Sequence, residues 1–221
     1  MNSSGDRPKR PYRAGVRAEQ ATATRTRIAE AAADLFAREG FAAATVAAVA
    51  DMAGVSAQTV YNVFETKAAL LKVAYDITLS GDDADLPLAE RPNVKALYEV
   101  SDAAEFLHGY AALGRGLLER VAPLTLQVHA GAAAGEPDLV ALMETMNGER
   151  LVGTRFAAGR VAELGALRPH LSVDDARDRI WTLNSVEIWH LLVDLRSWSP
   201  RQYEEWVGDQ MCAAVLAVAT P

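Results

Sequence analysis

The sequence predicts an all-α protein in two parts: a small N-terminal helical domain and a larger helical domain behind it. Apolar residues recur at helical spacing in almost every segment, as Ile28, Ala32 and Leu35 do. We find no run that alternates apolar β-branched and polar residues, as a half-buried strand would. The apolar segments also begin after Ser or Thr and stop at Gly, which is typical of capped helices.

The N-terminal part divides into four expected helices. Gly40 followed by Phe41 is a C-cap signal, Thr45 and Ser56 are N-cap candidates, and Val60, Val63 and Phe64 form the expected inner face of the third helix. The expected helices are, in order, Thr24–Glu39, Thr45–Gly54, one from Ser56 through Phe64, and Thr66–Gly81.

Residues 81–92 contain three Asp and two Pro, which predicts a loop between the two parts. Ser172 before Asp174 and Asp175, and Ser199 before Pro200, mark two later helix starts. The expected helices of the second part are Val94–His108, Ala111–Arg120, Pro123–Ala134, Pro137–Leu164, Val173–Ser197 and Pro200–Ala219. We therefore expect three regions: a flexible basic arm at 1–21, a first domain at 22–80 and a second at 81–221.

The composition excludes several classes of protein. With 221 residues, half of them apolar, the chain is long enough to bury a core. Its single cysteine, Cys212, cannot form a disulfide within the chain, and the N-terminus shows no apolar run typical of a signal peptide. The longest apolar stretches are shorter than the roughly 20 residues that span a bilayer. We therefore expect a cytoplasmic protein with no membrane partner.

The net charge of −7 hides an uneven distribution. Residues 1–80 carry ten Lys or Arg against eight Asp or Glu, whereas residues 81–221 carry twelve against twenty-one. Within the basic arm, Arg10, Arg13 and Arg17 are candidates to enter a minor groove of DNA. A solvated tail without a partner is the alternative for the arm taken alone.

The second and third helices have the spacing of a helix-turn-helix: Ala50, then Gly54 four residues on, then Val60 six further. A small residue lets the two helices cross, a glycine can take the left-handed conformation of a tight turn, and an apolar residue anchors the pair in the core. An ordinary αα-hairpin would satisfy the same triplet.

Residues 24–71 resemble the DNA-binding domain of the TetR family over many positions. The matching residues are Ala-Ala-Ala-Asp-Leu-Phe-Ala-Arg-Glu-Gly-Phe from Ala31, Thr45, Val46-Ala-Ala-Val-Ala, Gly54-Val55-Ser56, Thr59-Val60-Tyr61, Phe64, Lys67, Leu70 and Leu71. Departures are Asn62 and Val63, where rings are common in the family, and Gln58, where a small residue is common. The resemblance implies a transcriptional regulator. The departures leave its operator sequence open, but not its mode of DNA binding.

The third helix offers Gln58, Thr59 and Asn62 outward as candidate base-reading residues. Gln and Asn amides pair with adenine N6 and N7, and a Thr methyl packs on the thymine methyl. The resemblance implies phosphate contacts from Tyr61, Thr45 and Lys67, and Ser56 at a helix N-terminus joins them.

The resemblance also implies a homodimer on a palindromic operator, formed by the last two helices, and a ligand pocket in the middle helices. Burial inside the protomer is the alternative for both sets of apolar residues. The dimer candidates are Ile180, Leu183, Ile188, Leu191, Leu195, Tyr203, Trp206, Val207, Met211, Ala214 and Val218. The pocket candidates are Phe106, Tyr110, Leu117, Leu126, Met143, Met146 and Asn147. The family mechanism is repression relieved by an unidentified small-molecule effector.

A metal-binding helical bundle is the rival interpretation. Glu105 with His108, and Glu187 with His190, are two Glu-x-x-His pairs, the spacing that supplies ligands in di-iron bundles. Two further inward glutamates would be required, and Glu119, Glu144 and Glu163 are available. Cys212 lies among apolar residues and is expected to be a buried hydrophobe rather than a nucleophile. We expect no cofactor, no metal and no catalysis.

Overall fold

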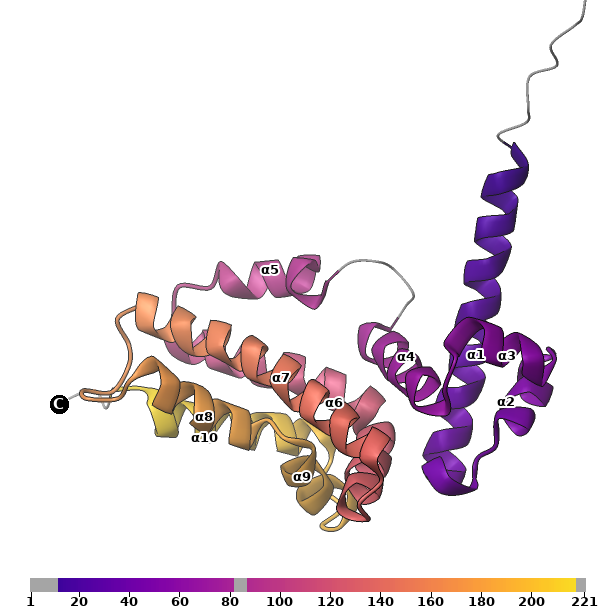
Figure 1. Ribbon diagram of the computed structural model, residues 1–221. Coiled ribbons are helices and arrows are strands. Elements are labelled where there is room, and N and C mark those ends of the chain that lie inside the picture. Colours follow the sequence, from indigo (N-terminus) through magenta and orange to yellow (C-terminus); the bar gives the residue numbers. More distant parts are fainter. Residues whose placement is uncertain (1–11, 82–86, 218–221) are drawn as a thin grey trace, which may run out of the picture.

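The structure is a computed structural model that describes residues 12–81 and 87–217, with side chains described from residue 19 onward. It is all-helical apart from one isolated bridge between Leu167 and Leu216 within the described ranges (Figure 1). The elements are α1 (Tyr12–Ala43), α2 (Val46–Ala53), α3 (Ala57–Phe64), α4 (Lys67–Ser80), η1 (Leu88–Glu90), α5 (Pro92–Tyr98), α6 (Ala103–Ala133), α7 (Pro137–Glu163), α8 (Val173–Leu183), α9 (Val186–Trp189), η2 (His190–Asp194) and α10 (Pro200–Val215).

The molecule is elongated, with α1, α2 and α3 at one end and α5–α10 at the other (Figure 1). Helix α4 lies between the two ends and packs against α1, α6 and α7. The all-α prediction and the order of the two parts are therefore confirmed.

Helix α1 is longer than the sequence analysis expects. It begins at Tyr12 rather than Thr24, so residues 12–21 are helical and only residues 1–11 of the expected arm lie outside the described residues. The segment Arg17-Ala-Glu-Gln-Ala consists of strong helix formers, which explains the extension. The expected end is confirmed, because Gly40 has φ 83° and ψ 161° and interrupts the helix there.

Helix α6 joins two expected helices and the end of a third into one. The expected helix Val94–His108 is instead divided, since Asp102 caps a new helix by accepting from the Glu105 N–H at 2.8 Å. Gly109 does not break α6, because Leu97 packs where its Cβ would stand. Pro123 lies inside the helix between buried neighbours Ala122 and Leu124, and this burial outweighs the hydrogen bond that proline lacks.

The expected helix Val173–Ser197 is also divided. Its first piece ends at Asn184, and Ser185 caps the short helix α9 by accepting from the Ile188 N–H at 3.4 Å. The chain then continues as the π-helix η2. The side chain of Asn184 packs against Gly114 of α6, where a Cβ would meet the Asn184 Oδ1 at 2.2 Å. This contact with another helix places the break.

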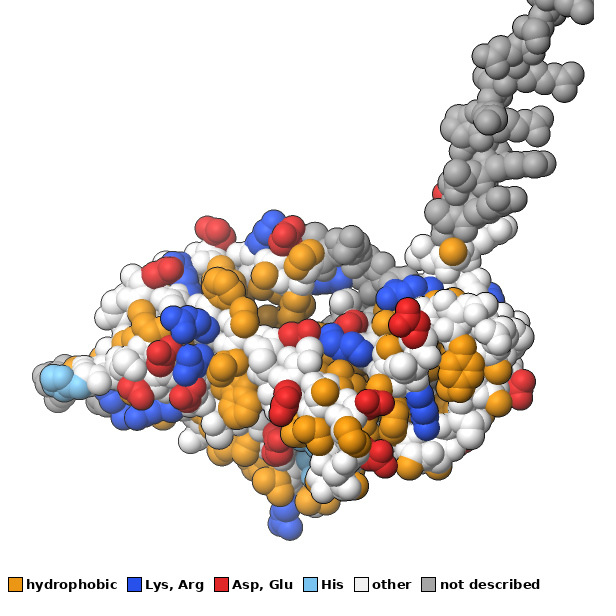
Figure 2. All heavy atoms as spheres, viewed as in Figure 1, with side chains coloured by type: hydrophobic (Ala, Val, Ile, Leu, Met, Phe, Trp, Pro, Cys, Tyr) orange, Lys and Arg blue, Asp and Glu red, His pale blue; other side chains and the backbone are white. Residues whose placement is uncertain are grey.

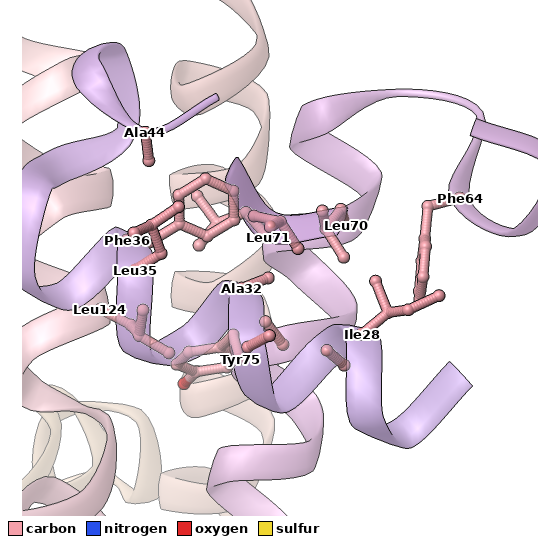
Figure 3. Close-up of a cluster of buried hydrophobic side chains, with 14 of the residues drawn as sticks. Ile28, Ala32, Leu35, Phe36, Ala44, Phe64, Leu70, Leu71, Tyr75 and Leu124 are labelled. Carbon is pink, nitrogen blue, oxygen red and sulfur yellow. The ribbon is translucent and has the colours of Figure 1, made fainter. Parts of the chain in front are cut away.

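Two clusters of buried side chains hold the molecule together. The second cluster lies among α6–α10 and includes Phe106, Ile180 and Tyr203. The first, shown in part in Figure 3, joins α1–α4 to α6 and α7. Figure 3 labels Phe36, Tyr75 and Leu124, which come from α1, α4 and α6 respectively. The expected boundary at residue 80 therefore separates helices that share one core.

Among the described helices, none combines the length and the apolar character that crossing a membrane requires.

Candidate nucleic-acid interface and internal cavity

The turn between α2 and α3 is built around Gly54, which has φ 65° and ψ 38°. This left-handed conformation lets the Val55 N–H donate to the Ala50 carbonyl at 2.9 Å, which closes the end of α2. An L-residue with a Cβ adopts this conformation only at a cost, so the sequence needs glycine here. The helix-turn-helix spacing of Ala50, Gly54 and Val60 is thus present in three dimensions.

The N-termini of α2 and α3 are capped by exposed hydroxyl side chains. The Thr45 Oγ1 accepts from the Ala48 N–H at 3.1 Å, and the Ser56 Oγ accepts from the Thr59 N–H at 3.0 Å. The Ser56 and Thr59 hydroxyls also bond to each other at 2.8 Å. Both expected N-caps are confirmed, and both lie at a helix end that favours an anion.

Helix α3 turns two residues into the core and several outward. Val60 and Phe64 are buried, whereas Gln58, Tyr61 and Asn62 are exposed and Thr59 is half-buried. The Gln58 Nε2 donates to the Asn62 Oδ1 at 2.9 Å, so the two amides form one polar surface.

Val63 was expected inside and is 40% exposed, which corrects that assignment. At about 100° per residue, Val63 lies about 100° from Phe64 around the helix axis. The core is formed at the Val60 and Phe64 positions, so Val63 falls on the edge of the outward surface. A further apolar residue is therefore available beside the amides.

Lys67, at the start of α4, has partners within the protein. Its Nζ donates to the carbonyl oxygens of Phe41 and Ala42, the second at 3.5 Å. The ammonium also lies 4.4 Å from the centroid of the Phe41 ring. Partial burial lowers the pKa of Lys67. The side chain thus ties the N-terminus of α4 to the C-terminal end of α1.

The arm candidates lie where side chains are not described. Arg10 falls outside the described residues, and Arg13 and Arg17 belong to the first turns of α1. The N-terminal part of that helix projects away from the rest of the molecule (Figure 1).

A cavity of about 510 Å³ opens to the surface between α4, α5, α6 and α7, a size that accommodates a small organic ligand. The molecule is visibly hollowed between α5 and α7, with apolar side chains in the hollow (Figure 2). The lining residues are mostly apolar, with a few polar ones: Tyr75, Leu79, Leu88, Ala89, Val94, Tyr98, Tyr110, Leu113, Gly114, Leu117, Met146, Glu149, Arg150, Val152, Gly153, Thr154, Phe156 and Asn184.

Of the seven pocket candidates, Tyr110, Leu117 and Met146 line this cavity. Phe106 is completely buried in the second core, and Leu126 packs against the same core. Met143 packs against the first core. Asn147 does not line the cavity, and its Oδ1 accepts a hydrogen bond from Arg150 at 3.1 Å. Four candidates are therefore structural rather than lining residues.

Apart from Tyr110, the polar residues that line the cavity were not among the pocket candidates. Burial raises the pKa of Tyr75 and of Tyr98 to about 12, and it also raises the pKa of Tyr110, so these phenols stay protonated at neutral pH. Arg150 and Asn184 come from helices α7 and α8, which approach each other only in the folded chain. The one signal available in the sequence was Arg150, an arginine four residues after Met146 on the helix face that is predicted to point inward.

The dimer candidates divide into two groups. Ile180, Tyr203, Val207 and Met211 are completely buried within the protomer, so they are core residues and not interface residues. Leu191 and Leu195 are exposed by 51% and 59%. The half-buried candidates are Leu183, Ile188, Trp206 and Ala214, and Val218 lies outside the described residues. The physical reason is that α8 and α10 each use one face to cover α6 and α7.

The two Glu-x-x-His pairs do not converge. His108 faces Asp209 at 3.5 Å, His190 faces Asp194 at 2.8 Å, and Glu187 faces His129 at 3.2 Å. Over residues 12–81 and 87–217, no group of three or more His, Cys, Asp or Glu side chains is placed to hold a metal ion. The metal-bundle alternative is therefore wrong in its geometry. Partial burial raises the pKa of the Cys212 thiol, in agreement with an apolar environment.

The comparison with protein families places residues 28–74 in one of them. These residues match the family of bacterial regulatory proteins described as the tetR family. The match covers α2 and α3 together with most of the α1 and α4 residues that pack on them. No curated protein matches the sequence of the chain.

Solved structures of similar fold cover almost the whole chain. A TetR-family transcriptional regulator from Rhodococcus sp. has a TM-score of 0.69 at 17% identity, over 86% of this chain and 97% of its own. A transcriptional regulator from Saccharomonospora viridis, solved in complex with choline, has a TM-score of 0.67 at 22% identity, over 88% and 98%. The transcriptional regulator FadR from Bacillus subtilis, in complex with stearoyl-CoA, has a TM-score of 0.69 at 18% identity, over 86% and 98%.

Proposed function

We propose that this chain is a ligand-responsive repressor of the TetR family, because residues 28–74 match the tetR family of bacterial regulatory proteins and the fold is similar to that of a TetR-family transcriptional regulator. In this proposal a homodimer binds a palindromic operator and a small-molecule effector releases it. The role is one of binding, with no catalytic step, and it is exercised in the cytoplasm, where the DNA is.

The observation that carries the proposal is the outward surface of α3. Gln58, Asn62 and Tyr61 are exposed on a short helix whose other side is fixed in the core by Val60 and Phe64. Amide side chains on such a helix can read adenine edges in a major groove, and Thr59 adds a methyl for thymine. We propose Gln58, Thr59 and Asn62 as the base-reading residues.

Four residues around α3 are proposed to hold the phosphate backbone: Thr45, Ser56, Tyr61 and Lys67. Thr45 and Ser56 use their oxygen atoms to accept from the backbone, and a hydroxyl can still donate its proton to a phosphate. Tyr61 is half exposed beside them. Arg10, Arg13 and Arg17 of the N-terminal segment are proposed to reach an adjacent minor groove.

A second protomer is proposed to pack on the apolar surface of α9 and η2. Leu191 in η2 and Leu195 directly after it are exposed large apolar residues, and Ile188, just before η2, is half-buried. One recognition helix reads only a few base pairs, so a two-fold dimer on a palindrome supplies the remaining specificity.

The cavity is proposed as the effector site, because Tyr75 and Leu79 of α4 form part of its wall. Helix α4 directly follows the recognition helix and shares the first core with α1 and α3. A ligand that favours another position of α4 would therefore move the recognition helices of a dimer relative to each other. The difference in its affinity for the two states sets the extent of release.

The function is tested by binding of the full chain to the DNA upstream of its own gene and of neighbouring genes. We expect a footprint over an inverted repeat, and binding to this DNA at least about a hundredfold tighter than to random DNA at the same salt concentration. Equal affinity for both DNA samples would contradict a sequence-specific regulator. A footprint over an asymmetric site would contradict the dimer.

A further inference from the structure

Arg150 brings a positive charge to the wall of a mostly apolar cavity. Its guanidinium donates to the carbonyl oxygens of Trp181 and Asn184 at 2.9 and 3.0 Å, and to the Asn147 Oδ1 at 3.1 Å. The guanidinium also lies 4.7 Å from the centroid of the Trp181 ring. All these partners are neutral, and no carboxylate in the described part of the chain forms an ion pair with Arg150.

The nearest acidic groups have partners other than Arg150. Glu149 lines the cavity, but its carboxylate lies 3.1 Å from the Lys72 ammonium and its side chain is half exposed. Glu187, on α9, lies 3.2 Å from the His129 ring nitrogen. The hydrogen-bond partners of Arg150 are therefore all dipoles, and the Glu187 carboxylate acts on its charge only through space, without an ion pair.

Asn184 supplies a second polar group that lacks a partner. Its Oδ1 is buried without a hydrogen bond, and the residue lines the cavity beside Arg150, to which it also offers its backbone oxygen. The oxygen and nitrogen of an amide are easily interchanged when a structure is assigned, so this end of Asn184 accepts or donates. A buried polar group without a partner is costly, and a ligand that pairs with it removes that cost.

We infer that the cavity binds an amphipathic anion: a carboxylate whose head group pairs with Arg150 and whose apolar body lies among Leu113, Leu117 and Phe156. The inference rests on the proposed function of the cavity as the effector site and specifies the chemistry of its ligand. A guanidinium and a carboxylate form a charge-assisted pair that is strong where water is excluded. The Asn184 amide completes the recognition of the head group.

A cationic ligand fits the same residues less well. Tyr75, Tyr98 and Tyr110 line the cavity and offer ring faces that attract a cation. A cation there would meet the charge of Arg150, which has no ion pair in the described part of the chain, while the one carboxylate among the described lining residues, Glu149, lies 3.1 Å from the Lys72 ammonium. The fold is shared with proteins solved with choline and with stearoyl-CoA, so the fold alone leaves the sign of the ligand charge open. In this chain the positive charge of Arg150 favours a negatively charged ligand.

The test compares four ligands that share one ten-carbon chain and differ in the head group: decanoate, methyl decanoate, decanol and decyltrimethylammonium. Each is titrated by calorimetry into the full-length protein without DNA. We expect decanoate to bind at least about tenfold more tightly than each of the other three, because only it pairs with Arg150. The carboxylate series is repeated with octanoate and palmitate to cover the length of the cavity.

Arg150→Gln removes the charge and keeps donors for the Trp181 and Asn184 carbonyls. We expect this variant to lose the preference for decanoate over methyl decanoate. Arg155→Gln is the matched control, because Arg155 lies on the same helix with its side chain 65% exposed and its ion pair to Asp174 outside the cavity. The control should keep the preference within about twofold. Should Arg150→Gln fail to fold, the head-group comparison on the unaltered protein still decides.

Three results would overturn the inference: equal binding of the ester, tighter binding of the quaternary ammonium, or no carboxylate of any length binding below about 1 mM. Its failure is distinct from failure of the proposed function. Specific operator binding without a preference for carboxylates rejects only the ligand class. Tight carboxylate binding that leaves operator binding unchanged rejects only the regulatory role.

Discussion

At the scale of single residues, the polar side chains of α3 have two different geometries. Gln58 and Asn62 are bonded to each other at 2.9 Å and are presented together, so their positions are mutually fixed before any DNA is bound. Tyr61 lies on the same short helix, and its side chain is exposed. An amide held in place suits base reading, because its own oxygen and nitrogen must both lie in the plane of the adenine edge to form a bidentate pair.

Gln58→Ala should relax the preference for one base pair of the operator by about 1–3 kcal/mol, because it removes the amide that distinguishes adenine. Tyr61→Phe is the matched change of a phosphate contact, and it should weaken binding to all operator variants about equally. Both are measured by gel-shift titration over a set of single-base operator variants. Equal losses from the two substitutions on every variant would show that the roles are assigned wrongly.

Lys67 differs from the other phosphate candidates because its ammonium is already bonded to the Phe41 and Ala42 carbonyls. We expect Lys67→Met to lower the free energy of unfolding by about 1–2 kcal/mol, since a charged hydrogen bond is lost. If Lys67 also contacts a phosphate, Lys67→Met should reduce by about one the slope of the logarithm of the operator affinity against the logarithm of the salt concentration.

Lys95→Met is the control for Lys67→Met, because Lys95 is exposed on α5 and far along the chain from the recognition helix. Lys95→Met should change neither the free energy of unfolding nor the salt dependence of operator binding. Urea unfolding and salt titration of DNA binding measure them separately. An unchanged stability in Lys67→Met would contradict the structural role.

At the scale of elements, tertiary contacts override local helix signals. Gly109 and Pro123 predict helix ends by their intrinsic preferences, yet α6 continues through both. Leu97 fills the space left by Gly109, and buried residues flank Pro123. The contact of Asn184 with Gly114 has the opposite effect and ends α8 inside a region of continuous helical periodicity.

Substitution by alanine should change the stability of the protein in opposite directions at Gly54 and at Gly148. Neither has a neighbour within 4 Å of an added Cβ, so only backbone conformation differs. Gly54→Ala places alanine at φ 65° and should destabilise the protein by about 1 kcal/mol. Gly148→Ala, inside α7, should stabilise it by about 0.5–1 kcal/mol. Urea unfolding of both variants tests this, and a shift in the same direction would contradict the turn geometry.

At the scale of the whole molecule, the first core joins the two domains. Tyr75 of α4 is buried in this core and also lines the cavity, while Leu124 of α6 packs in it (Figure 3). A ligand in the cavity would therefore contact a helix whose other contacts hold the helix-turn-helix. Coupling between the two sites needs only this one shared element.

Leu195→Glu should convert the dimer into monomers at micromolar concentration, because it would bury a charge in the proposed apolar interface. Leu151→Glu is the control, since Leu151 is an exposed leucine on α7, 37% exposed against 59% for Leu195. Sedimentation velocity of both variants and the unaltered chain measures the change. Dissociation by Leu151→Glu alone would move the interface to α7.

Features that depend on neighbours within a few residues follow from the sequence alone. Helical periodicity, the Thr45 and Ser56 caps, the Gly54 turn and the exposed face of Gln58 and Asn62 are all local, because capping and turn chemistry act over three or four positions. Residues 24–71 also contain enough family-like positions to be identified from the sequence, and the matching region is 28–74.

Contacts between distant parts of the chain determine which apolar side chains are core, surface or cavity wall. Ile180 and Leu195 are equally apolar in a helical pattern, yet Ile180 is completely buried and Leu195 is 59% exposed. The cavity likewise required Tyr75, Arg150 and Asn184 to meet from three helices. The physical reason is that burial and charge pairing are summed over contacts far apart in the chain, so no short window of residues contains them.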